Sequence, residues 1–266
     1  MRELEREVTQ NETLLSERPT AGSIGVVGGG RLGGALSAAL RDAGYEVDGP
    51  AGRGEVPRGE AILLCVPDAE IPAAAEVVAG AAPFVGHTSG ATPLAALDPA
   101  VREGAHAFGL HPLQTVTGEG ADLRGCGCAV AGSSVDAVAL AAGIARSLGM
   151  RPFELDDDRR AAYHAAAAIA SNFGVTLLGA AEEVAVAAGI DASEARELLA
   201  PLVRTTVDNW AQLGAERALT GPVARGDEAT VAAHREAIAE ARPELVPLFD
   251  ALVERTRALA ARGVPA

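Results

Sequence analysis

The stretch "IGVVGGGRLGGAL" at residues 24–36 contains six glycines and begins with a run of β-branched residues. Within it, Gly28, Gly30 and Gly33 have the spacing G-x-G-x-x-G, where a predicted strand ends and a helix begins. In such a loop the first glycine permits a tight turn, the second lets the backbone approach a pyrophosphate, and the third lets the helix pack closely on the sheet. Free N–H groups at the helix start favour negative charge. We predict a dinucleotide-binding loop, with a plain structural turn as the alternative, formed by Gly28, Gly29, Gly30, Arg31, Leu32 and Gly33.

The choice of nucleotide depends on the residues in and after the second predicted strand. Asp48 follows Gly28 at the distance where NAD-binding proteins place the acid that binds the ribose. If the strand continues past Asp48, Arg53 lies in the next loop, where its guanidinium can bind the 2′-phosphate of NADP. We favour NADP bound through Arg53, and NAD bound through Asp48 stays open as the alternative.

Short β-rich runs alternate with alanine-rich helical patterns in the first part of the chain. The predicted strands lie at 23–28, 45–49, 61–66, 83–88, 105–110, 127–132 and 151–155. Helices are predicted between them at 31–43, 70–80 and 134–148. This alternation indicates βαβ units, so we predict an α/β fold in which a Rossmann domain contains a doubly wound, mainly parallel sheet.

After the segment 154–160 the pattern contains no further strand. Helices are predicted at 159–189, 191–214, 227–240 and 243–262, the first of them ending at Gly189. We therefore predict a mobile tail at 1–21, a dinucleotide-binding Rossmann domain at 22–156 and an all-α domain at 157–266.

The charged residues exclude several classes of protein. All 22 basic residues are arginines, and with 36 acidic residues the net charge is −14. So acidic a chain does not match nucleic-acid or anionic-membrane binding, which need basic surfaces. Because there is no lysine, Schiff-base chemistry and a lysine general acid are excluded.

Cysteine spacing and the apolar segments predict a cytoplasmic protein without a metal site. The odd set of three cysteines indicates a reducing compartment, and the C-x-C spacing of Cys126 and Cys128 is too short for the usual zinc knuckle. The first twenty residues lack the apolar segment of a signal peptide. The apolar run 165–181 contains Ser171 and Asn172, so we predict a buried helix of a soluble protein rather than a membrane span.

Six short motifs lie along the chain: "VVGGGRLG" (26–33), "LLCVPD" (63–68), "HTSGA" (87–91), "GLHPLQT" (109–115), "AYHAAAAIASN" (162–172) and "LTGPVARGD" (219–227). In this order and spacing they resemble a family of bacterial Rossmann-like proteins with a helical C-terminal domain of unassigned function. That family is similar to pyrroline-5-carboxylate reductase, ketopantoate reductase and the F420-dependent NADP reductases. The resemblance implies two domains, NADP binding and a homodimer formed through the helical domain.

The resemblance also implies roles for residues that follow the central strands. Val66, Pro67 and Asp68 end the strand at 61–66, and the matching turn of such reductases lies along the nicotinamide ribose; a plain helix start is the alternative. Ser89 is expected near the nicotinamide, where it can bind the cofactor. Ser89, or Thr88 as the alternative, can donate a hydrogen bond there during catalysis.

Two histidines stand at predicted strand ends. For His87 we favour a packed strand-end residue over a catalytic one. His111 precedes Pro112, which holds it extended and would aim its ring at a substrate pocket. Packing without a substrate is the alternative for His111.

The helix that contains His164 carries most of the predicted chemistry. His164 and Ser171 are seven positions apart and share a face, and Asn172 is one position further round. Polar groups in so apolar a helix need partners in the protein or in a substrate. We predict His164 as general acid with Asn172, and Ser171 as a substrate contact; a histidine satisfied between the domains is the alternative. Related hydroxyacid dehydrogenases use a lysine and an asparagine on the corresponding helix, and this chain has only the asparagine.

Arg225 is the predicted clamp for a substrate carboxylate, and a structural turn in which Asp227 caps the next helix is the alternative. Together these residues predict an NADPH-dependent oxidoreductase that transfers hydride to a small C=O or C=N substrate in the interdomain cleft. A 2-keto acid such as ketopantoate or a cyclic imine would fit. The alternative is a non-catalytic NADP(H)-binding sensor or partner subunit.

Overall fold

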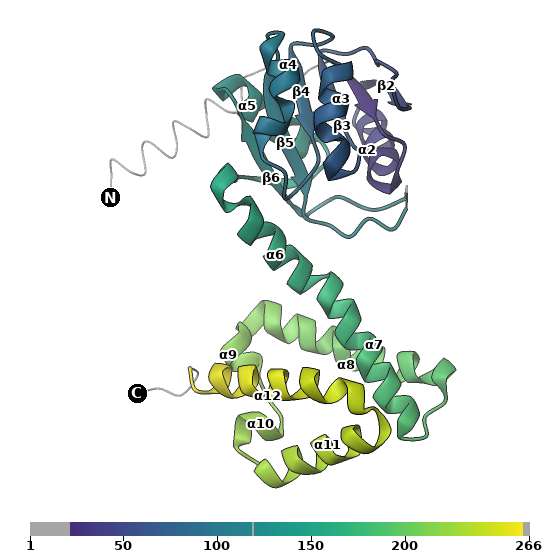
Figure 1. Ribbon diagram of the computed structural model, residues 1–266, viewed down its shortest axis with the longest axis vertical. Coiled ribbons are helices and arrows are strands. Elements are labelled where there is room, and N and C mark those ends of the chain that lie inside the picture. Colours follow the sequence, from purple (N-terminus) through teal and green to yellow (C-terminus); the bar gives the residue numbers. More distant parts are fainter. Residues whose placement is uncertain (1–21, 119, 263–266) are drawn as a thin grey trace. The chain divides into compact units, whose positions relative to one another are not determined.

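The computed structural model describes residues 22–118 and 120–262, so the tail predicted at 1–21 lies outside the described residues. The chain forms two compact units, the first ending at Ser171 and the second beginning at Asn172 (Figure 1). This division falls later than the domain boundary expected near residue 156. The physical reason is that the helix after that point keeps contacts with the sheet unit, through Arg160 and Tyr163.

The first unit is built on one seven-stranded sheet. Its strands are β1 (Ser23–Val27), β2 (Glu46–Ala51), β3 (Ala61–Leu64), β4 (Phe84–His87), β5 (His106–Pro112), β6 (Gly127–Gly132) and β7 (Arg151–Glu154). The strand order is β2-β1-β3-β4-β5-β6-β7, and only the β5–β6 pair is antiparallel. The mainly parallel, doubly wound sheet predicted from the sequence is confirmed, with all seven predicted strands present.

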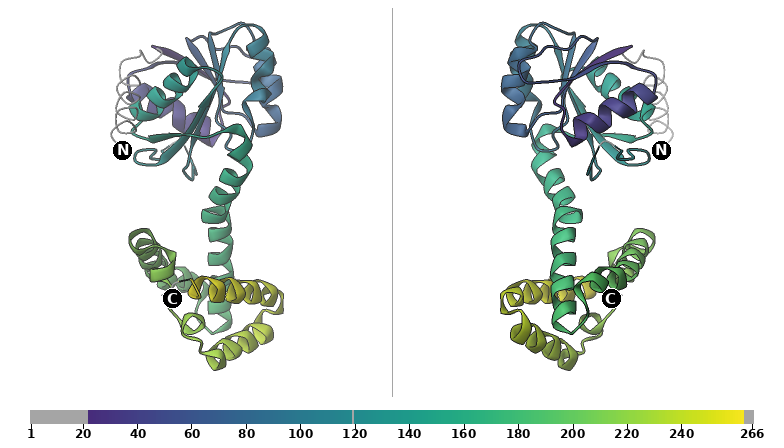
Figure 2. Two further views of the ribbon diagram at one scale, coloured as in Figure 1. Left: turned by 90° about the vertical axis from the view of Figure 1, so that its left-hand side faces the viewer. Right: turned by 90° about the vertical axis from the view of Figure 1, so that its right-hand side faces the viewer.

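Helices cover both faces of this sheet (Figure 2). On one face, α2 (Arg31–Asp42) and α5 (Val135–Ser147) bury leucine, isoleucine and alanine side chains against the strands. On the other face, α3 (Ile71–Val77) and α4 (Asp98–Arg102) do the same. The short helix α4 was not predicted, because five residues are too few to establish a helical period. The first unit also contains the short 3-10 turns η1 (Asp68–Glu70), η2 (Leu94–Leu97) and η3 (Asp157–Arg159), and the helix α6 (Arg160–Ala170).

The described part of the second unit is helical throughout. Its elements are α7 (Asn172–Ala187), α8 (Ala192–Leu213), α9 (Ala215–Ala218), α10 (Pro222–Arg225), α11 (Glu228–Ala241), η4 (Pro243–Leu245) and α12 (Val246–Ala260). The helix predicted at 159–189 is interrupted at Ser171, which separates α6 from α7. Asp191 caps α8 by accepting the Ser193 N–H at 2.9 Å.

One sequence prediction about burial was wrong. The run 165–181 was expected to be a buried helix, but no residue in it is buried. The helical stretch Asp157–Ala187 is, within the described residues, long and apolar enough to cross a membrane by length and composition. The prediction failed because the helices in the described part of the second unit bury few apolar side chains against one another: the buried apolar residues there are Ala195, Val231 and Val253.

Candidate functional site

The glycine loop lies where the strand order of the sheet reverses. The chain passes from β1 to β2 on one side and then to β3 on the other side of β1. In open α/β sheets, ligands bind at such switch points, outside the carboxyl ends of the strands. Gly28 has a φ of +100°, and a Cβ there would lie 2.4 Å from the carbonyl oxygen of Cys65. A Cβ on Gly33 would lie 1.9 Å from the Gly28 carbonyl oxygen, so both positions require glycine.

The remaining loop residues leave backbone accessible at the start of α2. A Cβ on Gly30 would meet nothing within 4 Å. Gly30 is the N-cap of α2, and no side chain accepts a hydrogen bond from the first N–H groups of that helix. Gly29, Gly30 and Arg31 are exposed. The loop therefore combines a tightly packed base with open N–H groups, which suits an anion such as a pyrophosphate.

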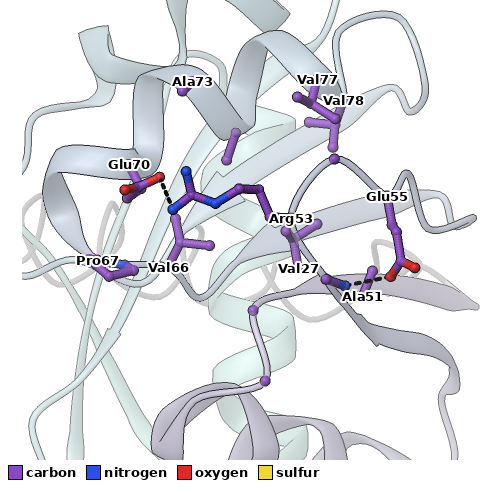
Figure 3. Close-up of a pocket in the computed structure, with 15 residues that line it drawn as sticks. Val27, Ala51, Arg53, Glu55, Val66, Pro67, Glu70, Ala73, Val77 and Val78 are labelled. Carbon is purple, nitrogen blue, oxygen red and sulfur yellow. Dashed lines mark hydrogen bonds and ion pairs between the residues drawn. The ribbon is translucent and has the colours of Figure 1, made fainter.

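A cavity of about 290 Å³ adjoins the glycine loop (Figure 3). Gly28 and Gly29 line it together with the loop after β2, the turn after β3 and helix α3. Arg53 lines the cavity and forms an ion pair with Glu70, Nη2 to Oε2, at 2.9 Å. The Arg53 side chain is 85% exposed and so remains accessible to a ligand.

The structure separates the two candidate nucleotide determinants. Strand β2 continues to Ala51, which places Arg53 in the following loop, the arrangement on which the NADP prediction depended. The Asp48 carboxylate lies within the strand, accepts the Arg58 N–H at 2.7 Å and does not line the cavity. The position at the end of β2 is occupied by Ala51, which cannot bind a ribose hydroxyl through its side chain.

The turn after β3 contains Val66, Pro67 and Asp68, and it contributes both to the cavity and to the charge near the histidines. Val66 and Pro67 line the cavity beside the glycine loop. Asp68 is exposed and begins η1. Burial lowers the pKa values of His87 and His111, and the negative charge of Asp68 opposes part of this lowering.

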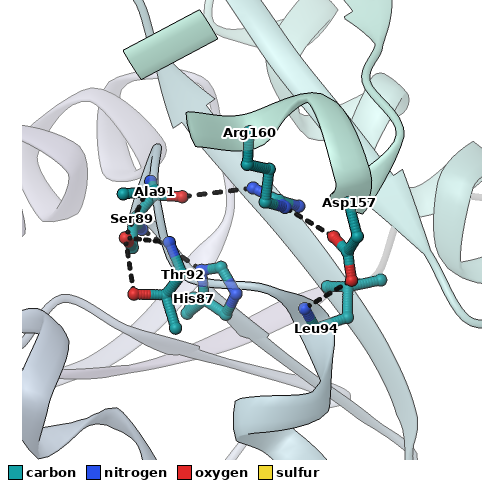
Figure 4. A network of polar contacts seen from close by, with 7 residues as sticks. All are labelled: His87, Ser89, Ala91, Thr92, Leu94, Asp157 and Arg160. Atoms are coloured by element: carbon teal, nitrogen blue, oxygen red, sulfur yellow. Dashed lines mark hydrogen bonds and ion pairs between the residues drawn. The ribbon is translucent and has the colours of Figure 1, made fainter. Parts of the chain in front are cut away.

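The turn after β4 is held by the Ser89 hydroxyl (Figure 4). Its oxygen accepts the N–H groups of Ala91 at 3.2 Å and Thr92 at 2.9 Å, and its O–H donates to Thr92 Oγ1 at 2.9 Å. Ser89 is 7% exposed. Within this structure the hydroxyl is engaged in the turn, so its predicted role as a donor to substrate requires these bonds to rearrange.

His87 is fully buried, in keeping with the packed strand-end interpretation. Its Nδ1 accepts the Ser89 N–H at 3.2 Å. Burial, followed by the nearby Arg160 guanidinium, lowers the pKa of His87 to about 4. The ring is therefore neutral near pH 7.

A buried arginine that the sequence analysis missed joins α6 to the turn after β4 (Figure 4). Arg160 is 2% exposed, and its Nε donates to Asp157 Oδ1 at 2.5 Å. Its Nη1 donates to the Ser89 carbonyl at 3.4 Å, and a Cβ on Gly109 would lie 2.7 Å from its Nη2. The other Asp157 oxygen accepts the Leu94 N–H at 2.8 Å. The acid-to-base spacing of three residues in 157–160 was the available signal.

Three ring side chains meet beside Gly90, at the carboxyl end of β5. His111 Nδ1 lies 2.8 Å from the Tyr163 hydroxyl, and the centroids of the His111 and His164 rings are 6.1 Å apart. A Cβ on Gly90 would lie 2.8 Å from His111 Nε2 and 2.9 Å from His164 Nδ1. Only glycine at position 90 lets the backbone pass this close to both rings. Tyr163 was quoted in a sequence motif but given no role.

Of the predicted site residues, Ser89, His111 and His164 come together in the first unit. Ser171 follows α6 and donates its hydroxyl to the Ala167 carbonyl at 2.8 Å. Asn172 begins α7 and Arg225 ends α10, both in the second unit.

Asp227 caps α11, as the structural-turn alternative proposed. It accepts the Thr230 N–H at 3.1 Å and the Thr230 hydroxyl at 2.7 Å. These two hydrogen bonds, and to a smaller extent the charges of Arg225 and His234, lower its pKa. The cap does not use the Arg225 side chain as a hydrogen-bond donor, so this finding leaves the clamp prediction for Arg225 in place.

Comparison with known proteins supports the same class of fold. Residues 126–256 match the family model described as a domain of unknown function, DUF2520. A candidate NADP oxidoreductase of Bacteroides fragilis is 22% identical, with a TM-score of 0.73 over 89% of this chain and 98% of its own. Protein TM1727 of Thermotoga maritima is 22% identical, with a TM-score of 0.72 over 90% and 98%. None of the curated proteins matches the sequence.

More distant similarity extends to pyrroline carboxylate reductase of Plasmodium falciparum, solved with NADP bound. It is 11% identical, with a TM-score of 0.59 over 90% of this chain and 98% of its own. The molecule is thus a Rossmann-like protein with a C-terminal helical domain, the class that its sequence motifs resemble. Its fold is similar to those of the solved proteins named above.

Proposed function

We propose that this protein is an NADPH-dependent oxidoreductase that reduces a small C=O or C=N substrate, for which a 2-keto acid such as ketopantoate and a cyclic imine are candidates. One observation carries the proposal. The glycine loop and the His111–Tyr163–His164 cluster follow β1 and β5, and β1, β3, β4 and β5 are mutually parallel, so both lie at one edge of the sheet. A dinucleotide bound across that edge would reach from one to the other.

The residues present fit an NADP molecule. Gly28 to Gly33 would hold the pyrophosphate, Arg53 the 2′-phosphate, and Val66 and Pro67 the nicotinamide ribose. Asp68 and Ser89 complete the proposed cofactor contacts. The Arg53 guanidinium lines the cavity beside the loop and Asp48 does not, which supports NADP over NAD.

The chain's own groups would orient the substrate and supply a proton. When bound, the reduced nicotinamide supplies the hydride. His164 is exposed, with Nδ1 directed at the Gly90 turn, and we propose it as the general acid. Asn172, which begins α7, is proposed to act with it. Arg225 is the proposed clamp for a substrate carboxylate, and Ser171 a further substrate contact.

The test begins with binding, by calorimetry of the full chain with NADPH and with NADH. We expect NADPH to bind more tightly, and failure of both nucleotides to bind would overturn the proposal. A screen of 2-keto acids and cyclic imines with NADPH then follows. His164→Ala should abolish turnover and leave NADPH binding intact. Binding without turnover of any substrate would instead favour the non-catalytic sensor or partner subunit.

We also propose that the protein is a homodimer formed through its helical domain. Large apolar side chains on α7 and α8 are exposed, among them Phe173 at 56%, Leu198 at 62%, Leu202 at 64% and Trp210 at 58%. A further cavity of about 470 Å³ lies between α7 and α8, lined by Val175, Leu178, Leu199 and Val203. A second copy of this surface would remove these side chains from water. A cytoplasmic location, without nucleic-acid or membrane partners, completes the proposal.

A further inference from the structure

The His111 ring is held by two elements of the first unit. It stands on β5 next to the final residue of that strand, and its Nδ1 lies 2.8 Å from the hydroxyl of Tyr163 on α6. The two rings are perpendicular, with an interplanar angle of 88°. Its other nitrogen, Nε2, lies beside the Gly90 turn after β4. Among the described residues Nε2 has no hydrogen-bond partner, so the described part of the chain leaves the hydrogen-bonding capacity of this nitrogen unused.

Both members of the pair are uncharged at neutral pH. Burial, then the neighbouring His164 and Arg160 of α6, lower the pKa of His111 to about 4, and Asp68 opposes this effect. Burial raises the pKa of Tyr163 to about 12. A neutral imidazole has one N–H donor and one acceptor nitrogen, whereas a neutral tyrosine can donate.

The tautomer of His111 follows from the direction of this hydrogen bond. A phenol O–H is a stronger acid than an imidazole N–H, so donation from tyrosine to the ring nitrogen is the stronger arrangement. It also gives the half-buried Tyr163 hydrogen a partner, since no other acceptor contacts that hydroxyl among the described residues. With Nδ1 accepting, the single N–H of His111 must be on Nε2.

We propose that His111 is a neutral hydrogen-bond donor to the substrate, through Nε2–H, and that Tyr163 is the positioning residue that keeps the proton on that nitrogen. This inference rests on the proposed reductase function and narrows its substrate class. An Nε2–H donor fits a carbonyl oxygen, and it repels a protonated imine, which carries a hydrogen of its own. The preferred substrate is therefore a ketone or aldehyde rather than a cationic imine.

The proposed step keeps His111 neutral throughout. As the carbonyl carbon gains a hydride, the electron pair of the C=O π bond moves to oxygen, and the negative charge that develops there is stabilised by Nε2–H. The oxygen then takes a proton from His164, the proposed general acid, and a C–H and an O–H bond replace the π bond. A neutral imidazole that polarises a carbonyl in this manner needs a lowered pKa, which burial supplies.

The decisive experiment needs no substrate. Long-range ¹H–¹⁵N correlation spectra of the full chain with ¹⁵N-labelled histidine report the tautomer of each of the five histidines. His111→Asn assigns the signal. We expect His111 to have its proton on Nε2 and to stay neutral across neutral pH. A proton on Nδ1, or a charged ring at pH 7, would overturn the proposal.

Tyr163→Phe keeps the aromatic ring and removes the hydroxyl, so His111 should become a mixture of the two tautomers. The matched control is Tyr45→Phe, because Tyr45 is the other tyrosine and its hydroxyl bonds Ser147 at 3.0 Å. The control should leave the His111 signals unchanged. An unchanged tautomer in Tyr163→Phe would remove Tyr163 from the positioning role.

A second readout separates this inference from the proposed function. NADPH affinity measured by calorimetry should be equal in wild type, Tyr163→Phe and His111→Asn. With a carbonyl substrate, kcat should fall about tenfold in Tyr163→Phe, the worth of one hydrogen bond. In His111→Asn, kcat with the same carbonyl substrate should fall about 100-fold. If the wild-type protein binds no NADPH, the proposed reductase function is rejected, while the tautomer of His111 measured by NMR still holds. If carbonyl turnover is unchanged in His111→Asn, the role of His111 as a donor to the substrate is rejected and the reductase function is kept.

Discussion

The two units of this chain bury their apolar residues very differently. In the first unit, two clusters of buried side chains lie between the sheet and the helices on its two faces. In the second unit, the described buried apolar residues are Ala195, Val231 and Val253, whereas leucines, valines, a phenylalanine and the tryptophan are exposed. Both units are rich in alanine and leucine, so composition does not explain the difference.

This difference in apolar burial indicates which interactions stabilise each unit. Burial of apolar surface is the dominant favourable term in folding, and the first unit has its own core. The second unit has helix N-caps and surface ion pairs such as Arg196–Glu182 and Arg235–Asp250. Ion pairs on exposed side chains contribute little to the free energy of unfolding. We therefore expect the first unit to respond to changes within its core, and the second to changes on its exposed surface.

The largest expected effect comes from charging that exposed surface. The double variant Leu198→Asp with Leu202→Asp places two carboxylates on α8, at positions now 62% and 64% exposed. In a homodimer it would remove four leucines from the interface, costing about 6 kcal/mol of association free energy. Sedimentation equilibrium should show a monomer in place of a dimer.

The matched control for this variant is Val135→Asp, because Val135 is 71% exposed on α5 of the first unit. It should remain dimeric. A wild-type protein that is monomeric at all concentrations would contradict the homodimer.

The second effect is a pH dependence of the first unit. Burial and the neighbouring Arg160 lower the pKa of His87 from 6.5 to about 4. Between these values the unfolded chain binds a proton that the folded chain does not, so stability is lost as the pH falls from 6.5 to 4. The loss is about 3 kcal/mol for this one group. Urea unfolding at a series of pH values measures it.

His87→Gln should reduce the slope of this pH profile, and the slope that remains includes the contribution of His111, whose pKa is also lowered to about 4 by burial. His234→Gln, at an exposed position of α11, is the control and should leave the slope unchanged. Equal slopes in wild type and His87→Gln would show that His87 titrates alike in the folded and unfolded chain.

The third effect separates packing from binding within the glycine loop. Gly33→Ala places a Cβ 1.9 Å from the Gly28 carbonyl oxygen, and should destabilise the first unit by about 2 kcal/mol and abolish NADPH binding. Gly30→Ala meets nothing within 4 Å, so it should weaken NADPH binding without lowering the melting temperature. Thermal unfolding and calorimetry of both variants test the pair. Equal melting temperatures would contradict the packing role of Gly33.

The smallest effect concerns the choice of nucleotide and leaves stability unchanged. Arg53→Ala should lower NADPH affinity about tenfold, the value of one strong charge-assisted contact, and leave NADH affinity as it was. Arg58→Ala is the matched control, because Arg58 lies in the same segment but does not line the cavity. Glu70→Gln should raise NADPH affinity by removing the carboxylate that pairs with Arg53. An unchanged NADPH-to-NADH ratio in Arg53→Ala would reject its proposed role.

Much of the first unit could be predicted from local sequence. The alternation of apolar runs and helical patterns located all seven strands. The signal is clearest for a central strand such as β3, which is buried on both faces and is therefore a continuous apolar run. The glycine spacing predicted the turn at Gly28 and the close approach at Gly33, since only a missing Cβ fits those positions. The position of Arg53 beyond the end of β2 could likewise be predicted from the length of that strand.

The contacts between distant segments could not be predicted in this way. Arg160 lies in a charged run that suggested a domain boundary, and only the folded chain brings its guanidinium to the Ser89 carbonyl. In the sequence, Tyr163 is a single aromatic residue next to a run of alanines, and nothing near it indicates a partner. Only the folded chain brings its hydroxyl to His111. The burial of α7 was predicted wrongly because periodicity reports an apolar helix but does not report what covers it.

The sequence by itself therefore determined the elements, the glycine loop and the class of fold, since these depend on spacing over a few residues and on the conformational freedom of glycine. Only the tertiary structure decided which histidine is neutral, which hydroxyl it contacts and which apolar surface stays exposed. Those properties depend on burial and on distances between residues far apart in the chain, which no local pattern encodes.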